Sequence, residues 1–251
     1  MEYLLLGIVQ GLTEFLPISS QGHLLIFERI FHLNVNIAFD TVVHLGTALA
    51  AIIYFWRDIL AIFTRERKIL GMLLITTFVT GVIGLAFKDY FEALFSAFQY
   101  VGPFFIVTGL VLLLGEWLGS KQSKNKNLNW LDAGLIGLAQ GLAIVPSLSR
   151  SAMTISAALS RNIDRGLAAR YSFLASIPAI LGAGVLQAKP IIKSGTLGIG
   201  YGPLLFGFIA AFISGLLAIK LFMGLIQRTS LRGFAYYCFG VGALVLFFSL
   251  R

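Results

Sequence analysis

Long runs of apolar residues, separated by short polar stretches, make up most of the 251-residue chain. Six of these runs have the length and apolarity of helices that cross a bilayer, which takes about 20 residues. They cover residues 41–56, 68–88, 101–118, 168–188, 203–225 and 233–250. In the fifth run, Gly207, Ala211 and Gly215 form a small-residue stripe that we expect to pack closely against another helix. The pattern predicts an all-α polytopic membrane protein with six transmembrane helices.

Two further apolar stretches, residues 3–27 and 130–160, are each interrupted near the middle by a proline and several serines. Proline ends or kinks a helix because it lacks a backbone N–H and its ring collides with the preceding turn. Inside a membrane, non-helical backbone survives only where protein or a wet cavity covers it. We therefore expect each stretch to form a re-entrant helix–loop–helix hairpin that turns back near the midplane.

The two hairpins resemble each other, because the tripeptide Gln-Gly-Leu precedes the proline in both, at 10–12 and at 140–142. Each hairpin is followed by three apolar runs. Since three is odd, the second hairpin would enter from the opposite face, which makes the two halves an inverted-topology repeat. We predict a first repeat at 1–120, a linker at 121–129 and a second repeat at 130–251.

The composition excludes a soluble globular domain. Hydrophobic residues make up 58% of the chain and charged residues only 12%, whereas soluble domains contain about 25% charged residues. The net charge is +8, but the basic residues form no stripe interleaved with aromatic residues, so no nucleic acid is expected as a partner. The single cysteine, Cys238, allows no internal disulfide.

The positive charges indicate the orientation, because cytoplasmic loops carry an excess of lysine and arginine. One side of the predicted topology receives thirteen of the 19 basic residues: Arg57, Arg65, Arg67, Lys68, Lys121, Lys124, Lys126, Arg161, Arg165, Arg170, Lys220, Arg228 and Arg232. The other receives Arg29, Lys88, Lys189, Lys193 and Arg251, and Arg150 lies at a hairpin tip. We expect a multi-pass protein of the cell (plasma) membrane, with the basic side cytoplasmic and the first hairpin on the external face.

Ionisable residues inside a membrane segment cost about 2.5–3.5 kcal/mol and indicate function by default. Three lie in the hairpins, beside the prolines and serines: Glu14, His23 and Arg150. Glu116 is assigned to the cytoplasmic interface, His32 to solvent and His44 to packing, without functional roles. We expect the two hairpin tips to share one polar site.

The second hairpin has the groups of a phosphate site. Arginine presents a planar fork that suits phosphate, and the second half-helix exposes its N-terminus at the turn. Hydroxyls surround the arginine, Arg150, at Ser147, Ser149, Ser151 and Thr154. The sequence therefore predicts a cradle for a phosphate group.

A carboxylate next to a phosphate is unfavourable unless a cation, a proton or the arginine intervenes. This argues for Mg²⁺ or Ca²⁺ with Glu14 as a ligand, because hard cations prefer oxygen. Simpler interpretations stay open: Glu14 could pair with Arg150 as a structural ion pair, and His23 could be a satisfied interior histidine. Ser19 and Ser20 could cap the second half-helix.

Two long motifs mark the hairpins. Residues 10–23 read QGLTEFLPISSQGH, residues 146–154 read PSLSRSAMT, and residues 171–178 read YSFLASIP. In this order they resemble the undecaprenyl-diphosphatase family, the BacA/UppP-type bacitracin-resistance proteins, whose motifs are (E/Q)xxxE, followed by Pro-x-Ser-Ser-x-Gly-His, and PGxSRSxxT. The resemblance runs through nearly the whole chain.

This resemblance implies an enzyme that hydrolyses undecaprenyl (polyprenyl) diphosphate to the monophosphate carrier lipid of envelope glycan synthesis, with a divalent cation and an active site open to the external side. Carried over by position, the catalytic residues are Glu14, Ser20, His23 and Arg150, with Glu14 also the metal ligand. The substrate-binding residues are Gln10, Ser19, Ser149, Arg150, Ser151 and Thr154. Ser20 would be the nucleophile and His23 its base, with direct attack by water as the alternative.

Two positions depart from the family motifs. Gln10 stands where many members have glutamate, which weakens a two-carboxylate metal site, and Ser147 replaces a glycine. A polyprenyl-phosphate flippase or an anion transporter could have the same architecture, but neither needs a nucleophile–base pair, so Ser20 and His23 favour the enzyme. The expected partners are the lipid substrate and the bilayer, and a homodimer is left open.

Overall fold

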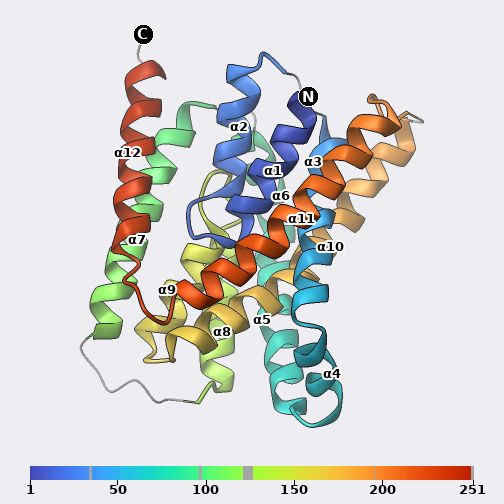
Figure 1. Ribbon diagram of the computed structural model, residues 1–251. Helices are drawn as coiled ribbons and strands as arrows, with labels where there is room; N and C mark the ends of the chain where they lie inside the picture. The colour runs from blue at the N-terminus through green and yellow to red at the C-terminus, as the bar shows by residue number, and fades with distance from the viewer. Residues whose placement is uncertain (34–35, 96–97, 121–126, 195, 250–251) are drawn as a thin grey trace.

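The computed structural model describes residues 1–33, 36–95, 98–120, 127–194 and 196–249, and within these ranges every regular element is helical. The helices are shown in Figure 1. In chain order they are α1 (Glu2–Phe15), α2 (Ser20–Ile30), α3 (Ile37–Tyr54), α4 (Trp56–Thr64), α5 (Arg67–Ala86), α6 (Lys88–Phe95), the 3-10 turn η1 (Phe98–Tyr100), α7 (Val101–Ser120), α8 (Trp130–Leu142), α9 (Arg150–Ser160), α10 (Arg165–Ser194), α11 (Tyr201–Leu225) and α12 (Arg232–Ser249).

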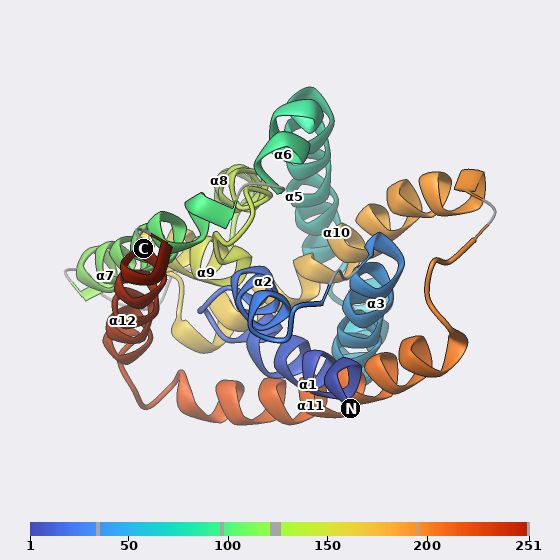
Figure 2. The ribbon, with the colours of Figure 1, turned by 90° about the horizontal axis from the view of Figure 1, so that it is seen from above.

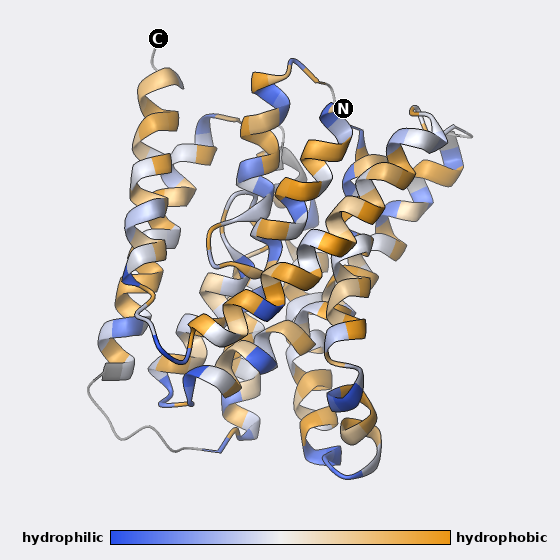
Figure 3. Cartoon of the chain, viewed as in Figure 1, coloured by the Kyte–Doolittle hydropathy of each residue, from blue (hydrophilic) through white to orange (hydrophobic). Residues whose placement is uncertain are grey.

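Six helical segments are long and apolar enough to cross a membrane, and they coincide with the six predicted runs. They are Ile37–Tyr54, Arg67–Ala86, Phe98–Gly119, Arg165–Lys193, Tyr201–Leu225 and Arg232–Ser249. Most residues of these helices are hydrophobic, whereas hydrophilic residues gather at turns such as the one next to α4 (Figure 3). The prediction of an all-α polytopic membrane protein is confirmed. The short helices α4 and α6 were not predicted from the sequence.

Two helix–turn–helix pairs, α1–α2 and α8–α9, lie where the hairpins are predicted. Their helices contain 14, 11, 13 and 11 residues, so each is too short to cross a bilayer alone. The turns contain Ser19 with a φ of 70° and Ser147 with a φ of 65°, a left-handed conformation that non-glycine residues adopt mainly in turns. Their insertion into the bilayer as re-entrant hairpins stays a prediction.

The two halves of the chain interlock. Helix α1 packs against α11, and its counterpart α8 packs against α5, so each pair contacts a long helix of the other half. Seen from above, α1 lies along α11, with α2 near the centre (Figure 2). This reciprocal packing fits two repeats, and their inverted orientation stays a prediction. Of the predicted linker, residues 121–126 lie outside the described residues.

Helices α1 and α11 approach closely because small residues face each other. A Cβ added at Gly7 would lie 2.4 Å from the carbonyl oxygen of Gly207, and one at Gly11 would lie 2.5 Å from that of Ala211 and 2.7 Å from the amide nitrogen of Gly215. The predicted packing role of the stripe on α11 is confirmed: α1, the helix that carries Glu14, packs against it, and so does α3, whose Phe39 ring would lie 2.5 Å from a Cβ added at Gly207.

Candidate active site

The turns of the two helix pairs meet inside the protein. The Arg150 Nη2 atom, at the start of α9, donates a hydrogen bond to Glu14 Oε1 at 2.5 Å. The Ser151 hydroxyl donates to the carbonyl oxygen of Leu16 at 3.0 Å. The structure therefore brings together the guanidinium of one predicted hairpin and the acid of the other.

The Glu14 carboxylate is the centre of the site. Its Oε2 atom accepts hydrogen bonds from Ser20 Oγ at 2.6 Å and from Gln10 Nε2 at 2.9 Å, in addition to the ion pair of Oε1 with Arg150. A buried charge is stable only where it is paired and hydrogen-bonded, and these donors come from α1, α2 and α9. The ion pair considered as a simple structural alternative exists, and it coexists with a hydroxyl on the same carboxylate.

The site retains unused hydrogen-bonding capacity. Among the described residues, Arg150 Nη1, Ser147 Oγ and Gln10 Oε1 are buried without a hydrogen-bond partner. Buried polar groups are normally satisfied, so these three atoms are available to bind a ligand. Because Nη2 holds Glu14, the free Nη1 lets the same guanidinium donate to an anion while it keeps its carboxylate partner.

His23 does not contact Ser20 in the way predicted. Its Nδ1 atom lies 2.6 Å from the carbonyl oxygen of Ser19, which can only accept, so Nδ1 carries a proton. In the neutral ring Nε2 then accepts from the Tyr237 hydroxyl at 2.7 Å. The prediction of His23 as the base for Ser20 relied on their spacing along a helix, but the ring turns back to its own N-terminal turn. The Ser20 hydroxyl instead faces Glu14.

Two of the predicted substrate-binding hydroxyls cap helices. Ser19 Oγ accepts from the amide of Gly22 at the start of α2, and Ser149 Oγ accepts from the amide of Ala152 at the start of α9, both at 3.2 Å. Capping satisfies amides that have no partner within the helix. Ser20 is not a cap, and its partly exposed hydroxyl remains next to Glu14.

The side chain of Thr154 and the backbone of Ser149 hold α9 against its neighbours. Thr154 Oγ1 donates to the carbonyl oxygen of Arg150 at 2.9 Å and lies 2.6 Å from Ser172 Oγ on α10. The amide of Ser149 donates to Thr108 Oγ1 on α7 at 3.2 Å. Thr154 is fully buried, so its position fits a role in holding the helix that presents Arg150. Ser172, within the third motif, is its partner.

The sequence interpretation missed three residues near the site. His44 on α3 was assigned to packing, but its Nε2 lies 3.8 Å from Glu14 Oε2, and its Nδ1 lies 3.5 Å from Asp40 Oδ1. The rule that selected Glu14 also applies to His44, which lies within the predicted run 41–56, and Asp40 directly precedes that run. Tyr237, which holds His23, gave no comparable signal, because a tyrosine in an apolar run is unremarkable by pattern alone.

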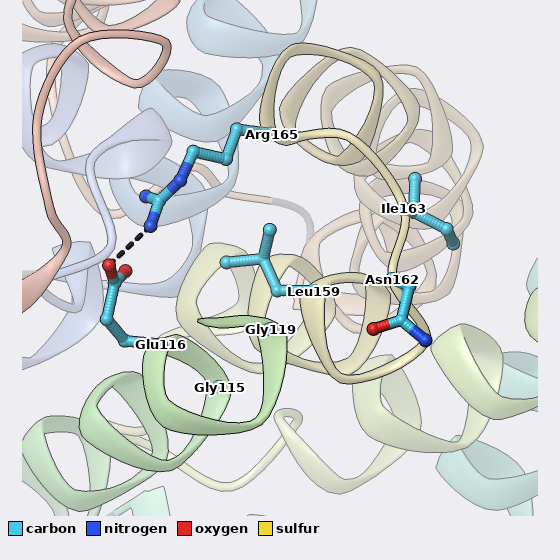
Figure 4. Close-up of a pocket in the computed structure, with 7 residues that line it drawn as sticks. All are labelled: Gly115, Glu116, Gly119, Leu159, Asn162, Ile163 and Arg165. Atoms are coloured by element: carbon cyan, nitrogen blue, oxygen red, sulfur yellow. Dashed lines mark hydrogen bonds and ion pairs between the residues drawn. The ribbon is translucent and has the colours of Figure 1, made fainter. Parts of the chain in front are cut away.

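Glu116 belongs to a separate ion pair with Arg165, shown in Figure 4. It is buried near the end of α7 and also accepts from the backbone amide of Leu231, and its assignment to the cytoplasmic interface stays a prediction. The adjacent pocket is lined by Gly115, Glu116, Gly119, Leu159, Asn162, Ile163 and Arg165. Its volume of about 10 Å³ has room for about one water. The pair therefore connects helices and lies outside the candidate active site.

Together, the fold and the site define a polytopic membrane protein whose buried polar centre is built by two helix–turn–helix pairs and contains an arginine, a carboxylate and a hydroxyl. The family model described as bacitracin resistance protein BacA matches residues 3–244. The chain belongs to this family.

Curated relatives match over almost the full length. An undecaprenyl-diphosphatase of Carboxydothermus hydrogenoformans is 45% identical over 249 residues, which are 98% of this chain and 95% of the relative. An undecaprenyl-diphosphatase of Halothermothrix orenii is 40% identical, with 98% and 96% covered. One from Methanosphaera stadtmanae is 39% identical, with 100% and 98% covered.

Proposed function

We propose that this protein is an integral membrane phosphatase that hydrolyses undecaprenyl (polyprenyl) diphosphate to the monophosphate carrier lipid and inorganic phosphate. Such an activity supplies carrier lipid for envelope glycan synthesis and gives bacitracin resistance. Family membership and the names of the relatives support this activity. A flippase or anion transporter is not favoured, because it has no need for a hydroxyl held by a carboxylate.

A single observation carries the proposal: a hydroxyl, a carboxylate and an unused guanidinium N–H lie together where the two helix pairs meet. Ser20 Oγ is 2.6 Å from Glu14, and Arg150 pairs with the same carboxylate while its Nη1 is without a partner among the described residues. Phosphoryl transfer needs a nucleophilic hydroxyl next to a group that accepts its proton, and a cationic donor that binds the phosphoryl oxygens.

In the proposed reaction Ser20 Oγ attacks the terminal phosphorus of the diphosphate, and its proton passes to Glu14 Oε2. The bond between that phosphorus and the bridging oxygen breaks, and the polyprenyl monophosphate leaves with the electron pair. Water then attacks the phosphoserine, releases inorganic phosphate and restores the hydroxyl. Direct attack by water held at Glu14 is the alternative.

Arg150 contributes charge and orientation. Its guanidinium stabilises the charge that spreads over the phosphoryl oxygens during transfer. It also keeps Glu14 ionised, so that this carboxylate is ready to accept the proton of Ser20. His23, hydrogen-bonded to Ser19 and Tyr237, fixes the turn that presents Ser20.

We propose a divalent cation that the substrate helps to bind. Gln10 Oε1 is a buried oxygen without a partner beside the Glu14 carboxylate, which gives two oxygen donors. The described residues contain no group of three or more His, Cys, Asp or Glu that could hold a metal alone. Mg²⁺ is commonly held by one or two protein groups with substrate phosphates and water. We propose that Glu14 and Gln10 hold Mg²⁺ or Ca²⁺, which would neutralise charge on the diphosphate.

We also propose that the protein lies in the cell membrane with its active site open to the external face. The excess of basic residues at one end supports this orientation. The N-terminus and the C-terminal end of α12 lie at the end of the molecule opposite to α4 (Figure 1), and α4 contains Arg57 and is followed by Arg65. The N-terminal end is then external.

The activity is tested by phosphate release from a C55 diphosphate by the purified protein in detergent, with and without EDTA. We expect phosphate release that EDTA suppresses and that added Mg²⁺ or Ca²⁺ restores. Release unaffected by EDTA would remove the cation from the proposal. In right-side-out vesicles, phosphate should appear in the outside medium, and its appearance in the lumen would reverse the orientation. Movement of polyprenyl phosphate across vesicles without phosphate release would support the transporter instead.

A further inference from the structure

A groove of about 400 Å³ runs between the α11–α12 turn and the tip of the first helix pair. Its lining is mostly apolar, with two hydroxyls from the α11–α12 turn. The lining residues are Ile18, Leu225, Thr229, Ser230, Gly233, Phe234 and Tyr237. Its volume is in the range of about 300–1,000 Å³ that is usual for ligand sites.

The groove adjoins the site at two points. Tyr237, which is 45% exposed, lines the groove with its side chain and holds His23 Nε2 through its hydroxyl at 2.7 Å. Ile18 lines the groove and directly precedes Ser19, the cap of the helix that begins with Ser20. An apolar ligand in the groove therefore ends beside the turn that presents the proposed nucleophile.

We propose that this groove binds the isoprenoid chain of the lipid substrate, an inference that depends on the proposed function. A polyprenyl diphosphate joins a charged group to a long chain without polar atoms. The polar centre matches the charged diphosphate, and the adjoining apolar groove matches the isoprenoid chain that is attached to it. The isoprenoid chain would enter the groove along the face between α11 and α12, while the diphosphate lies at Arg150.

The isoprenoid chain of the substrate differs from an ordinary bilayer lipid because it is covalently linked to the reacting diphosphate. Both chains are apolar, so exclusion from water does not favour one over the other inside a membrane, and packing decides. Filling the groove therefore disturbs catalysis only if the substrate's own chain uses it, and only for substrates with a chain long enough to reach along it.

Gly233 allows a direct test. A Cβ added at this position meets no atom within 4 Å, and the residue lies in the first turn of α12 on the groove wall. We propose Gly233→Trp to fill the groove, and Gly233→Leu as a milder second variant. Gly240→Trp is the matched control, since Gly240 is exposed on the same helix, has equally free space and is not part of the lining.

The measurement is kcat/KM for a C55 and a C15 polyprenyl diphosphate with each variant. We expect Gly233→Trp to lower the C55-to-C15 ratio by about tenfold, the lower end of the effect of one methylene group in an apolar pocket, and Gly233→Leu to lower it less. An unchanged ratio in both Gly233 variants, equal to that of Gly240→Trp, would overturn the inference and leave the groove to bilayer lipid. Absence of phosphate release from either substrate by the unmodified protein would overturn the proposed function instead, and this inference with it.

Discussion

At the scale of single residues, Glu14 connects every part of the candidate site. Arg150, Ser20 and Gln10 donate to its two oxygens, and His44 lies at 3.8 Å. A carboxylate held by three donors has a fixed position, so the hydroxyl that it holds is fixed as well. In the proposed reaction, this geometry makes Glu14 the base for Ser20, and His23 holds the turn.

Ser20→Ala tests the nucleophile. Without the hydroxyl no phosphoserine can form, and we expect kcat to fall by about 10⁴-fold or more, as for other nucleophile deletions, while the lipid still binds. Phosphate release and lipid binding are measured on the same preparation. The control is Ser249→Ala, whose exposed hydroxyl only donates to the carbonyl oxygen of Val245. Turnover above a tenth of the normal rate would assign the attack to water.

Which residues form the candidate site was easier to predict from the sequence than which of them contact each other. Ionisable groups in apolar segments identified Glu14 and Arg150, because their cost in a membrane makes them conspicuous. The contact between Ser20 and Glu14 depends on the turn that separates α1 from α2, where Ser19 adopts a positive φ. Tyr237, which bonds to His23, is 214 positions away in the sequence, and no local pattern indicates this contact.

At the scale of helices, the apolar runs and the two prolines were enough to predict six spans and two interrupted segments. The short helices α4 and α6 were missed because fewer than ten residues give too weak a periodic signal. The periodic pattern of apolar residues also does not indicate which helices pack against each other. Small residues on α11 indicated a close contact, but only the structure shows that the facing helices are α1 and α3.

Substitution of Gly11 tests this contact. A Cβ there would lie 2.0 Å from Ser214 Oγ and 2.5 Å from the carbonyl oxygen of Ala211, so the helices must separate. We expect Gly11→Leu to lower the free energy of unfolding by about 3 kcal/mol, the upper end of ordinary overpacking effects, and to reduce activity by shifting Glu14. Thermal unfolding in detergent measures the effect. Gly134→Leu on α8, with no atom within 4 Å of the added Cβ, should leave the melting temperature nearly unchanged. Equal effects of the two substitutions would argue against close packing of α1 on α11.

At the scale of the whole molecule, the two halves contribute different groups to one site. The first half supplies the carboxylate and the hydroxyl, and the second supplies the guanidinium. The reciprocal contacts of α1 with α11 and of α8 with α5 hold the two turns against each other. The candidate site therefore depends on the assembly of both halves, because neither half alone supplies all the proposed catalytic groups.

The most direct measurement of this convergence is a double-mutant cycle in kcat/KM with Glu14→Gln and Arg150→Gln. Residues that contact each other or act as a unit lose less together than the product of their separate losses. We predict that each single variant loses at least about 100-fold and that the double variant falls short of their product by about tenfold or more. The Asp58–Arg170 ion pair, whose side chains are both partly exposed and lie outside the site, provides a control cycle that should leave kcat/KM within about threefold of the unmodified protein. A Glu14–Arg150 double variant whose loss equals the product of the single losses would contradict a shared active site.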